Sequence, residues 1–328
     1  MLEGKKILVS GAGGQIALPI CEYLALHNEV WGIARFSEQA TRERLEKAGV
    51  TTRVVDLGRP DFSEVPEDFD YLLHLAAFLG PGTDYETALG INADGTGALL
   101  AHCRNAAAAL VMGTGSVYDP NPDPWHLYSE TDPLGDGHLP SVPTYSISKI
   151  AEEAVARTCA RLLNLPIVIA RMNVAYGANG GLAIFHLDSV VTDRPIAVRW
   201  DPAPYSPIFQ DDINEQVEPI LAAASVPATI VNWGGDEVVT VQEWSNYFGE
   251  LTGRTPRLDL GPVLGSHRGN ALDVSRRLAL TGPCRTSWRQ GMKAAYELRY
   301  PDGAFEGAVP PSSAARAVEA LATERADQ

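Results

Sequence analysis

The stretch KILVSGAGGQIA, residues 6–17, decides the fold of this chain. An apolar run at residues 6–10 stops at a glycine, and residues 16–26 follow with apolar side chains at helical spacing. The pattern predicts a strand, a glycine turn and a helix. Such a turn lets the backbone approach a pyrophosphate, whose charge then rests on the helix N-terminus. We therefore predict a dinucleotide site at Gly11, Gly13, Gly14, Gln15 and Ile16, with Ala17 packed closely against the strand.

Strands and helices alternate over the next ~150 residues. Strands are expected at 30–34, 51–55, 71–76, 110–112 and 166–170, and helices at 37–48, 85–108 and 145–163. This alternation is typical of βαβ units. It predicts an α/β fold with a doubly wound parallel sheet of the Rossmann type.

The regular alternation ends after Arg171, where short segments rich in Gly and Pro begin. We predict a Rossmann domain over 1–172 and a smaller, discontinuous C-terminal substrate lobe mainly over 173–302. Residues 205–233, with a strand at 229–232, are expected to complete the sheet. Further helices are predicted at 241–251 and 289–298, loops at 197–209, and a tail at 303–328.

Composition narrows the class of partner. The chain has 328 residues, of which 45% are apolar and 20% charged, as in soluble globular proteins. Its net charge of −15 argues against a nucleic acid or an anionic membrane surface as partner. No apolar run reaches the ~18 residues of a membrane span. The four cysteines are far apart, and no His, Asp or Glu cluster has metal-ligand spacing. We expect a cytoplasmic protein without a metal.

A tyrosine and a lysine four residues apart, Tyr145 and Lys149, fall on one face of the predicted helix at 145–163. An ammonium near a phenol favours the phenolate and lowers the pKa of the tyrosine from ~10. A tyrosine of this kind can exchange a proton with an alcohol or a carbonyl oxygen. The pair therefore predicts an acid/base residue and its cationic neighbour.

The end of the second strand bears on the choice of dinucleotide. Sites for NAD place an acidic residue there to accept a hydrogen bond from the ribose 2′-hydroxyl. This chain has Arg35 instead, which can pair with a 2′-phosphate. We therefore predict NADP in preference to NAD. Asp56 and Leu57 end the third strand beside the expected adenine, although Asp56 could equally serve a turn.

Several further motifs occur in one order along the chain. They are LHLAA at 73–77, Asn92-x-x-Gly95-Thr96, GTGSVY at 113–118, Arg171-x-Asn173-x-x-Tyr176-Gly177 and IFQDD at 208–212. With the glycine turn and the Tyr145–Lys149 pair, the chain resembles the extended short-chain dehydrogenase/reductase family. The resemblance is to the NAD-dependent epimerase/dehydratase branch, and it covers residues 5–298.

The resemblance implies roles for particular residues. Tyr145 would be the acid/base, Lys149 would bind the nicotinamide ribose, and Thr114 would hydrogen-bond the reacting oxygen. Ser116 is a second candidate for that bond. Cofactor contacts would come from Leu75, Ala76, Ala77, Asn92 and Asn173, the last of these near the nicotinamide or the substrate. The family also implies a homodimer packed through helices 85–108 and 144–163.

The substrate stays open between alternatives. A sugar-like small molecule, such as a nucleotide sugar, is implied by the branch, with epimerisation and net redox chemistry as rivals. Epimerases clamp the substrate diphosphate with an Arg just before the motif at 208–212. That Arg is absent here, and Arg268 is the one candidate clamp. Dehydration is disfavoured because Gly115, not an acidic residue, follows Thr114. A reductase of a non-sugar carbonyl and a non-catalytic dinucleotide sensor are the alternatives.

Overall fold

The computed structural model describes residues 2–80 and 82–301. Its centre is a sheet of seven strands in the order β11-β6-β5-β4-β1-β2-β3. Every neighbouring pair in this sheet runs parallel. The strands are β1 (Lys6–Ser10), β2 (Glu29–Ala34), β3 (Thr51–Val54), β4 (Tyr71–His74), β5 (Ala108–Thr114), β6 (Ile167–Met172) and β11 (Thr229–Trp233). The predicted doubly wound α/β fold is confirmed.

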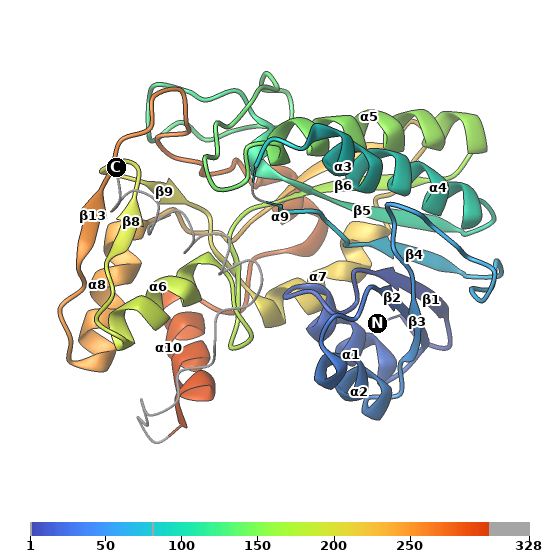
Figure 1. Cartoon of the computed structure of the whole chain (residues 1–328), viewed down its shortest axis with the longest axis horizontal. Coiled ribbons are helices and arrows are strands. Elements are labelled where there is room, and N and C mark those ends of the chain that lie inside the picture. Colours follow the sequence, from blue (N-terminus) through green and yellow to red (C-terminus); the bar gives the residue numbers. More distant parts are fainter. Residues whose placement is uncertain (1, 81, 302–328) are drawn as a thin grey trace.

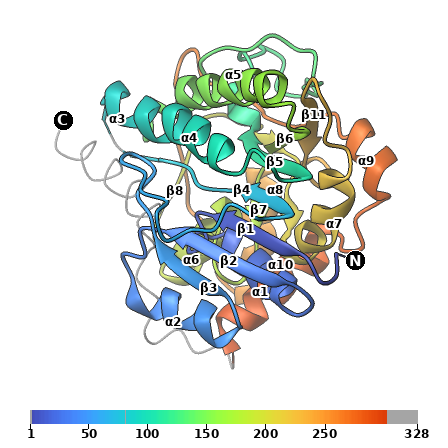
Figure 2. The same cartoon turned by 90° about the vertical axis from the view of Figure 1, so that its right-hand side faces the viewer.

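Helices cover both faces of this sheet (Figures 1 and 2). One face packs against α1 (Ala17–Ala25), α2 (Gln39–Lys47) and α7 (Gln210–Leu221). The other packs against α4 (Gly95–His102) and α5 (Tyr145–Leu163). All residues of β5 and β6 are buried. Parallel strands covered on both sides need such continuous apolar runs, which is why the sequence revealed them.

The prediction of a single long helix at 85–108 is wrong. The chain forms α3 (Tyr85–Leu89), a π-helical turn η1 (Gly90–Asp94) and then α4, which ends at His102. Gly95 lies so close to the third strand's end that a Cβ there would stand 2.6 Å from the Leu57 carbonyl oxygen. The wider π turn also brings the side chain of Asn92 inward, where it is buried.

A smaller lobe beside the carboxyl edge of the sheet has its own apolar core (Figure 1). Its helices are α6 (Leu182–Val191), α8 (Val241–Thr252) and α10 (Trp288–Arg299). The last two match the predicted helices at 241–251 and 289–298. Helix α9 (Ser275–Thr281) lies near β11, which returns to the sheet beside β6 as expected. The domain boundaries stay a prediction.

Short strands replace part of the loop predicted at 197–209. They are β8 (Ile196–Val198), β9 (Pro204–Tyr205) and β10 (Ile208–Phe209), which pair with β13 (Leu258–Leu260), β12 (Val239–Thr240) and β7 (Ala175–Tyr176) respectively. The three pairs tie the excursions of the lobe together. The tail at 303–328 lies outside the described residues.

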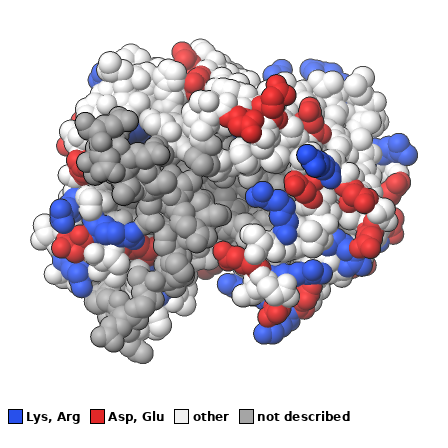
Figure 3. All heavy atoms as spheres, viewed as in Figure 1, with Lys and Arg blue, Asp and Glu red and all other residues white. Residues whose placement is uncertain are grey.

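The surface carries charges of both signs. On the face shown in Figure 3, acidic and basic side chains alternate over the part of the molecule that holds the sheet. Among residues 2–80 and 82–301, no helix has the length and apolar character needed to span a bilayer.

Candidate functional site

A cavity of about 910 Å³ opens along the carboxyl ends of the central strands. That is the edge where ligands bind in open parallel sheets. Fifteen of the residues singled out from the sequence line it. They are Gly11, Gly13, Gly14, Gln15, Ile16, Arg35, Asp56, Leu57, Leu75, Ala76, Ala77, Thr114, Tyr145, Lys149 and Asn173. The fold thus brings the glycine turn, the second-strand Arg and the Tyr–Lys pair to one site.

The glycine turn is built for close backbone approach. Gly11 has a φ of +69°, and a Cβ on it would lie 2.6 Å from the Cα of Ala76. Only glycine therefore fits between the ends of β1 and β4. Helix α1 starts beside the turn with no side-chain cap and no carboxylate in its first turn. The positive dipole end of α1 suits a pyrophosphate and the glycine turn lets the backbone come close to it, so the residues present fit a dinucleotide.

The rim beyond β2 carries cationic groups. Arg35 is exposed and lines the cavity, and it forms no ion pair within the described part of the chain. Arg44, also on the rim, is held by Glu22 through two hydrogen bonds of 2.6 and 2.8 Å. Arg35 is thus the cation available to a ligand phosphate at this rim. Asp56 lines the cavity but also accepts the N–H of Gly58 at 2.9 Å, which is the turn role left open by the sequence.

Thr114, Tyr145 and Lys149 meet at the end of β5. Thr114 is its last residue, and its hydroxyl hydrogen-bonds that of Tyr145, the first residue of α5. Lys149 lies one helical turn further on and donates from Nζ to the carbonyl oxygen of Met112 at 2.8 Å. Two hydroxyls and an ammonium therefore converge on the cavity wall, in the arrangement needed to exchange a proton with a bound oxygen.

The pKa of Tyr145 differs from the expectation. Burial of the phenol raises its pKa above the ordinary value, and this is the largest effect. The charge of Lys149 and the hydrogen bond from Thr114 lower the pKa, as predicted, but they do not outweigh burial. The predicted net depression is therefore wrong for the protein without ligand.

An ion pair inside the protein fixes the helix that carries Tyr145. Arg171, on β6, donates to both carboxylate oxygens of Glu153 on α5 at 2.8 and 2.7 Å. Both side chains are 2% exposed, and the guanidinium also lies over the ring of Tyr118 at 4.8 Å. A bidentate pair of this kind sets the position of α5 on the sheet. It thereby sets the height of Tyr145 above β5.

The remaining candidates lie further from the reacting centre. Asn92 is outside the cavity lining; its amide bonds the backbone of Phe78 and the hydroxyl of Ser148 at 2.9 Å. It therefore braces α5 next to Lys149. Asn173 lines the cavity, but its amide donates to Asn270 and accepts from the N–H of Ser206. It joins the sheet to the lobe.

The two other residues suggested for the substrate do not line the cavity. Ser116 is half-buried in the short turn η2 (Gly115–Val117), and its N–H donates to the hydroxyl of Thr114 at 3.2 Å. Arg268 is exposed, with its guanidinium 4.8 Å from the ring centre of Trp200. Their substrate roles stay predictions.

The chain matches a known protein family. The model of the NAD dependent epimerase/dehydratase family matches residues 7–190, more than half of the chain. The chain belongs to the NAD dependent epimerase/dehydratase family. It is therefore an enzyme of this family, as the motifs indicated, rather than a member of an unrelated Rossmann group. No curated protein sequence matches it.

Solved structures of UDP-sugar 4-epimerases share the fold at low identity. UDP-glucuronic acid 4-epimerase from Bacillus cereus, in complex with UDP-glucuronic acid and NAD, is 21% identical with a TM-score of 0.78, over 90% of this chain and 98% of that one. UDP-glucose 4-epimerase from Thermus thermophilus, in complex with NAD, is 22% identical with a TM-score of 0.75, over 93% and 100%. UDP-N-acetylglucosamine 4-epimerase from Methanobrevibacter ruminantium M1 is 17% identical with a TM-score of 0.78, over 90% and 98%.

These comparisons support NAD, and not NADP, as the dinucleotide. The family is named for NAD, and the complexes contain NAD. The preference for NADP finds no support there and rests on Arg35 alone. It stays a prediction, which affinity measurements can decide.

Sequence reasoning missed several residues of this site. Asn179, Phe185 and Arg299 line the cavity from the lobe, and no local pattern marks them because only the folded chain brings them there. Arg299 is held by Asp188 through two bonds of 2.7 Å. Glu152 was also missed, although a signal existed: it follows Tyr145 and Lys149 at helical spacing on one face of α5.

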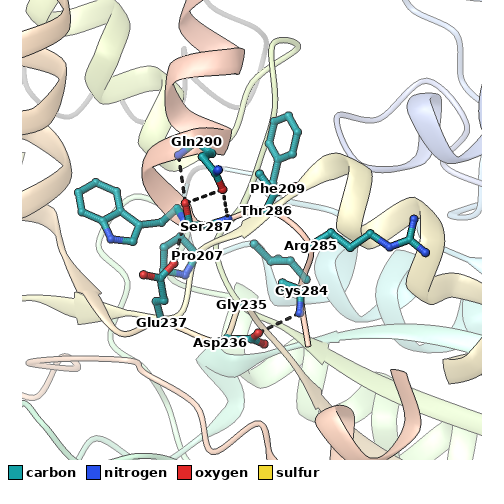
Figure 4. A pocket seen from close by; sticks show the side chains of 12 residues that line it. Pro207, Phe209, Gly235, Asp236, Glu237, Cys284, Arg285, Thr286, Ser287 and Gln290 are labelled. Atoms are coloured by element: carbon teal, nitrogen blue, oxygen red, sulfur yellow. Dashed lines mark hydrogen bonds between the residues drawn. The ribbon is translucent and has the colours of Figure 1, made fainter. Parts of the chain in front are cut away.

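A second cavity, of about 280 Å³, lies at the start of α10 (Figure 4). Its polar groups are already paired with one another. Asp236 accepts the N–H of Cys284 and Glu237 that of Trp288, each at 2.9 Å, while Ser287 and Gln290 form a capping box. Arg285 points away from the cavity, toward Glu215. These contacts explain the cavity as part of the packing between the lobe and α7.

Proposed function

We propose that this protein transfers hydride between a nicotinamide dinucleotide and a secondary alcohol or ketone of a sugar-like substrate, with Tyr145 as the acid/base. One observation carries the proposal. The Thr114–Tyr145 hydrogen bond and the ammonium of Lys149 line the same cavity as the glycine turn. A dinucleotide anchored at that turn would extend along the cavity toward them.

The chain's own residues supply binding and proton transfer. Backbone N–H groups of the glycine turn, together with the positive end of α1, would bind the pyrophosphate, and Thr114 with Tyr145 would hydrogen-bond the reacting oxygen. Tyr145 gives a proton to that oxygen when it is a ketone and takes one when it is an alcohol. The cofactor, when bound, would donate hydride to the substrate carbon or accept hydride from it.

A turnover assay tests this function. The protein is incubated with UDP-glucose or UDP-glucuronic acid, the sugars bound or processed by the similar structures, with NAD(H) or NADP(H) in parallel. An epimerase would convert the sugar to its 4-epimer, separated by chromatography, without net change in cofactor absorbance. A dehydrogenase or reductase would change that absorbance once per turnover. Dinucleotide binding without turnover of nucleotide sugars, free sugars or simple ketones would contradict the proposal and favour a sensor.

A reductase of a non-sugar carbonyl is the second candidate. Two observations favour it. The stretch before the 208–212 motif contains no Arg to hold a diphosphate. Arg268, the other candidate, is exposed on Trp200 and outside the cavity lining. In the assay above, this candidate predicts turnover of small ketones and none of UDP-sugars.

Substitution of Arg35 tests the dinucleotide preference. Because Arg35 is the unpaired cation on the described rim beyond β2, Arg35→Ala should weaken NADPH binding by about tenfold to hundredfold, the value of a charged hydrogen bond to phosphate. NADH binding should be almost unchanged. Arg104→Ala, which removes an exposed Arg just before β5, is the matched control. Equal loss for both nucleotides, or tighter binding of NADH by the native protein, would refute the 2′-phosphate role.

Assembly is proposed on the resemblance alone. The helices expected to form a homodimer correspond to α3, α4 and α5, and Leu162 on α5 is 79% exposed. Single exposed apolar residues are common on protein surfaces, so Leu162 is not evidence for a subunit contact. The homodimer stays a prediction.

A further inference from the structure

Arg299 brings a cation from the lobe into the cavity of the candidate site. It is the last residue of α10, and its side chain is only 10% exposed. Among the described residues, the cationic side chains that line this cavity are those of Arg35, Arg44, Lys149 and Arg299. Of these, Arg299 alone comes from the lobe. A cation buried in a cavity wall is costly unless it is paired or meets an anionic ligand.

An ion pair orients the guanidinium of Arg299. Its Nε and Nη2 donate to the two carboxylate oxygens of Asp188 on α6, each at 2.7 Å, and the Tyr300 hydroxyl donates to the same carboxylate at 2.6 Å. Asp188 is buried and does not line the cavity, so it holds the guanidinium from behind. Burial lowers the pKa of Arg299, but the hydrogen bonds and the charge of Asp188 raise it above the ordinary value. Arg299 is therefore a cation held in one orientation.

A tight turn at residues 177–180 joins Arg299 to the glycine turn, and backbone hydrogen bonds between its two ends close it. The carbonyl oxygen of Ala178 in this turn accepts from Nη1 of Arg299 at 2.8 Å. The next residue, Asn179, donates from its amide to the carbonyl oxygen of Gln15, which belongs to the predicted pyrophosphate site. Two neighbouring residues of one turn thus hold Arg299 and that site close together.

The charge of a bound pyrophosphate calls for a cation beside the glycine turn. A pyrophosphate carries two negative charges, and a helix end offers only about half a positive charge. Arg35 lies on the exposed rim beyond β2, and Arg44 there is held by Glu22. Lys149 lies at the end of the cavity that holds the reacting hydroxyls. Arg299 is the cation of the described lining that hydrogen bonds link to the glycine turn.

The guanidinium of Arg299 also keeps donors for a ligand. A guanidinium has five N–H groups. Three of them make the bonds to Asp188 and to the Ala178 carbonyl oxygen. This leaves one N–H on each terminal nitrogen outside these three bonds, and N–H donors on a cation are the groups that bind phosphate oxygens best.

We propose that Arg299 is a cofactor-binding residue whose guanidinium donates to the pyrophosphate of the dinucleotide, so that the cofactor is held between the glycine turn and the lobe. This proposal rests on the dinucleotide site of the function proposed above and adds a second binding surface to it. Asp188 is a positioning residue in this arrangement, because it acts through Arg299. The contribution is the same for NAD and NADP, since both contain the pyrophosphate.

Calorimetric titration with three probes tests the proposal and needs no turnover. The preferred dinucleotide, NADH or NADPH, is the first probe. ADP-ribose keeps the pyrophosphate without the nicotinamide, and adenosine, measured by competition with the dinucleotide, has neither. All three are titrated into the native protein and into Arg299→Gln. Arg289→Gln is the matched control, because it removes an exposed Arg from the other end of α10.

We expect Arg299→Gln to bind the dinucleotide and ADP-ribose about tenfold to hundredfold more weakly than the native protein, the value of hydrogen bonds to a charged group. The affinity for adenosine should not change, and Arg289→Gln should bind all three probes as the native protein does. Unchanged affinity for ADP-ribose in folded Arg299→Gln would overturn the proposal. An equal loss for adenosine would overturn it too, since distortion of the cavity would then explain the result.

Two further variants separate ligand binding from packing of the lobe. Asp188→Asn removes the carboxylate and keeps the cation, so it should bind ADP-ribose within about threefold of the native protein. A loss as large as in Arg299→Gln would show that the ion pair only holds the lobe together, against the proposal. Arg299→Lys keeps the charge without the planar fork and should weaken ADP-ribose binding by about twofold to tenfold.

Arg299→Lys also provides the test where Arg299→Gln does not fold, because native affinity for ADP-ribose in Arg299→Lys would refute the proposal. The two proposals fail in different ways. A native protein that binds neither a dinucleotide nor ADP-ribose would contradict the proposed function itself. Tight binding that does not depend on Arg299 would contradict this inference alone.

Discussion

Replacement of Tyr145 by phenylalanine should lower the turnover rate by about three orders of magnitude, within the ~10²–10⁴ range of general acid–base catalysis. The ring and its packing stay, and only the hydroxyl that meets Thr114 is lost. Cofactor affinity should change little, because the glycine turn and the rim at Arg35 are untouched. The loss should therefore fall on kcat, measured with whichever substrate the turnover assay identifies.

A second tyrosine provides the control for this experiment. Tyr85, at the start of α3, is 38% exposed and its hydroxyl makes one long contact of 3.5 Å to the Pro143 carbonyl oxygen. Tyr85→Phe should leave kcat within about twofold of the native value. If Tyr145→Phe also kept its rate, another group would have to carry the proton and the assigned role would be wrong.

Substitution of Gly11 by alanine should cost about a hundredfold or more in dinucleotide affinity, equivalent to about 2.8 kcal/mol. Two effects add. The φ of +69° is unfavourable for any residue with a Cβ, and that Cβ would lie 2.6 Å from the Cα of Ala76. Backbone atoms cannot move aside as a flexible side chain can, so β1 and β4 must separate where the pyrophosphate should bind. Calorimetric titration with NADH and NADPH measures the loss.

Gly4 separates the two effects. It has a similar φ of +63°, but a Cβ on it would meet nothing within 4 Å. Gly4→Ala should therefore lower the free energy of unfolding by about 1–2 kcal/mol, the cost of the backbone conformation alone, and leave cofactor affinity unchanged. Equal cofactor affinity in the native protein and in folded Gly11→Ala would show that the ligand does not use the glycine turn.

The sequence predicted the core of the fold because local signals and the fold agree there. Continuous apolar runs gave the buried strands, and the glycine turn at Gly11 marked the junction of β1 and α1. The long helix at 85–108 was mispredicted because its apolar spacing continues through η1. The π turn lies where Asn92 hydrogen-bonds Phe78 and Gly95 packs against Leu57. These contacts are made by the folded chain and leave no local signal in the sequence.

Residues of the candidate site could be predicted from the sequence only where they belong to a recognisable motif. Tyr145 and Lys149 could be found from their helical spacing, and Thr114 from the family resemblance at the end of a predicted strand. The net pKa of Tyr145 could not, since burial depends on the whole assembly of α5 and the sheet. Arg299 and Asn179 reach the cavity only through the lobe. Glu152 lay on the predicted helix face, but its buried contact with Lys149 appears only in the folded chain.

The most direct test of this account is the identity and affinity of the bound nucleotide. The purified protein is denatured, any released nucleotide is identified by mass spectrometry, and native protein is titrated with NADH and NADPH. We expect one dinucleotide site per chain, with either resident NAD, as an epimerase that recycles its cofactor would retain, or reversible uptake of NADPH, as a reductase requires. A protein that releases no nucleotide and binds neither dinucleotide would contradict the assignment of the glycine turn, and with it the function proposed here.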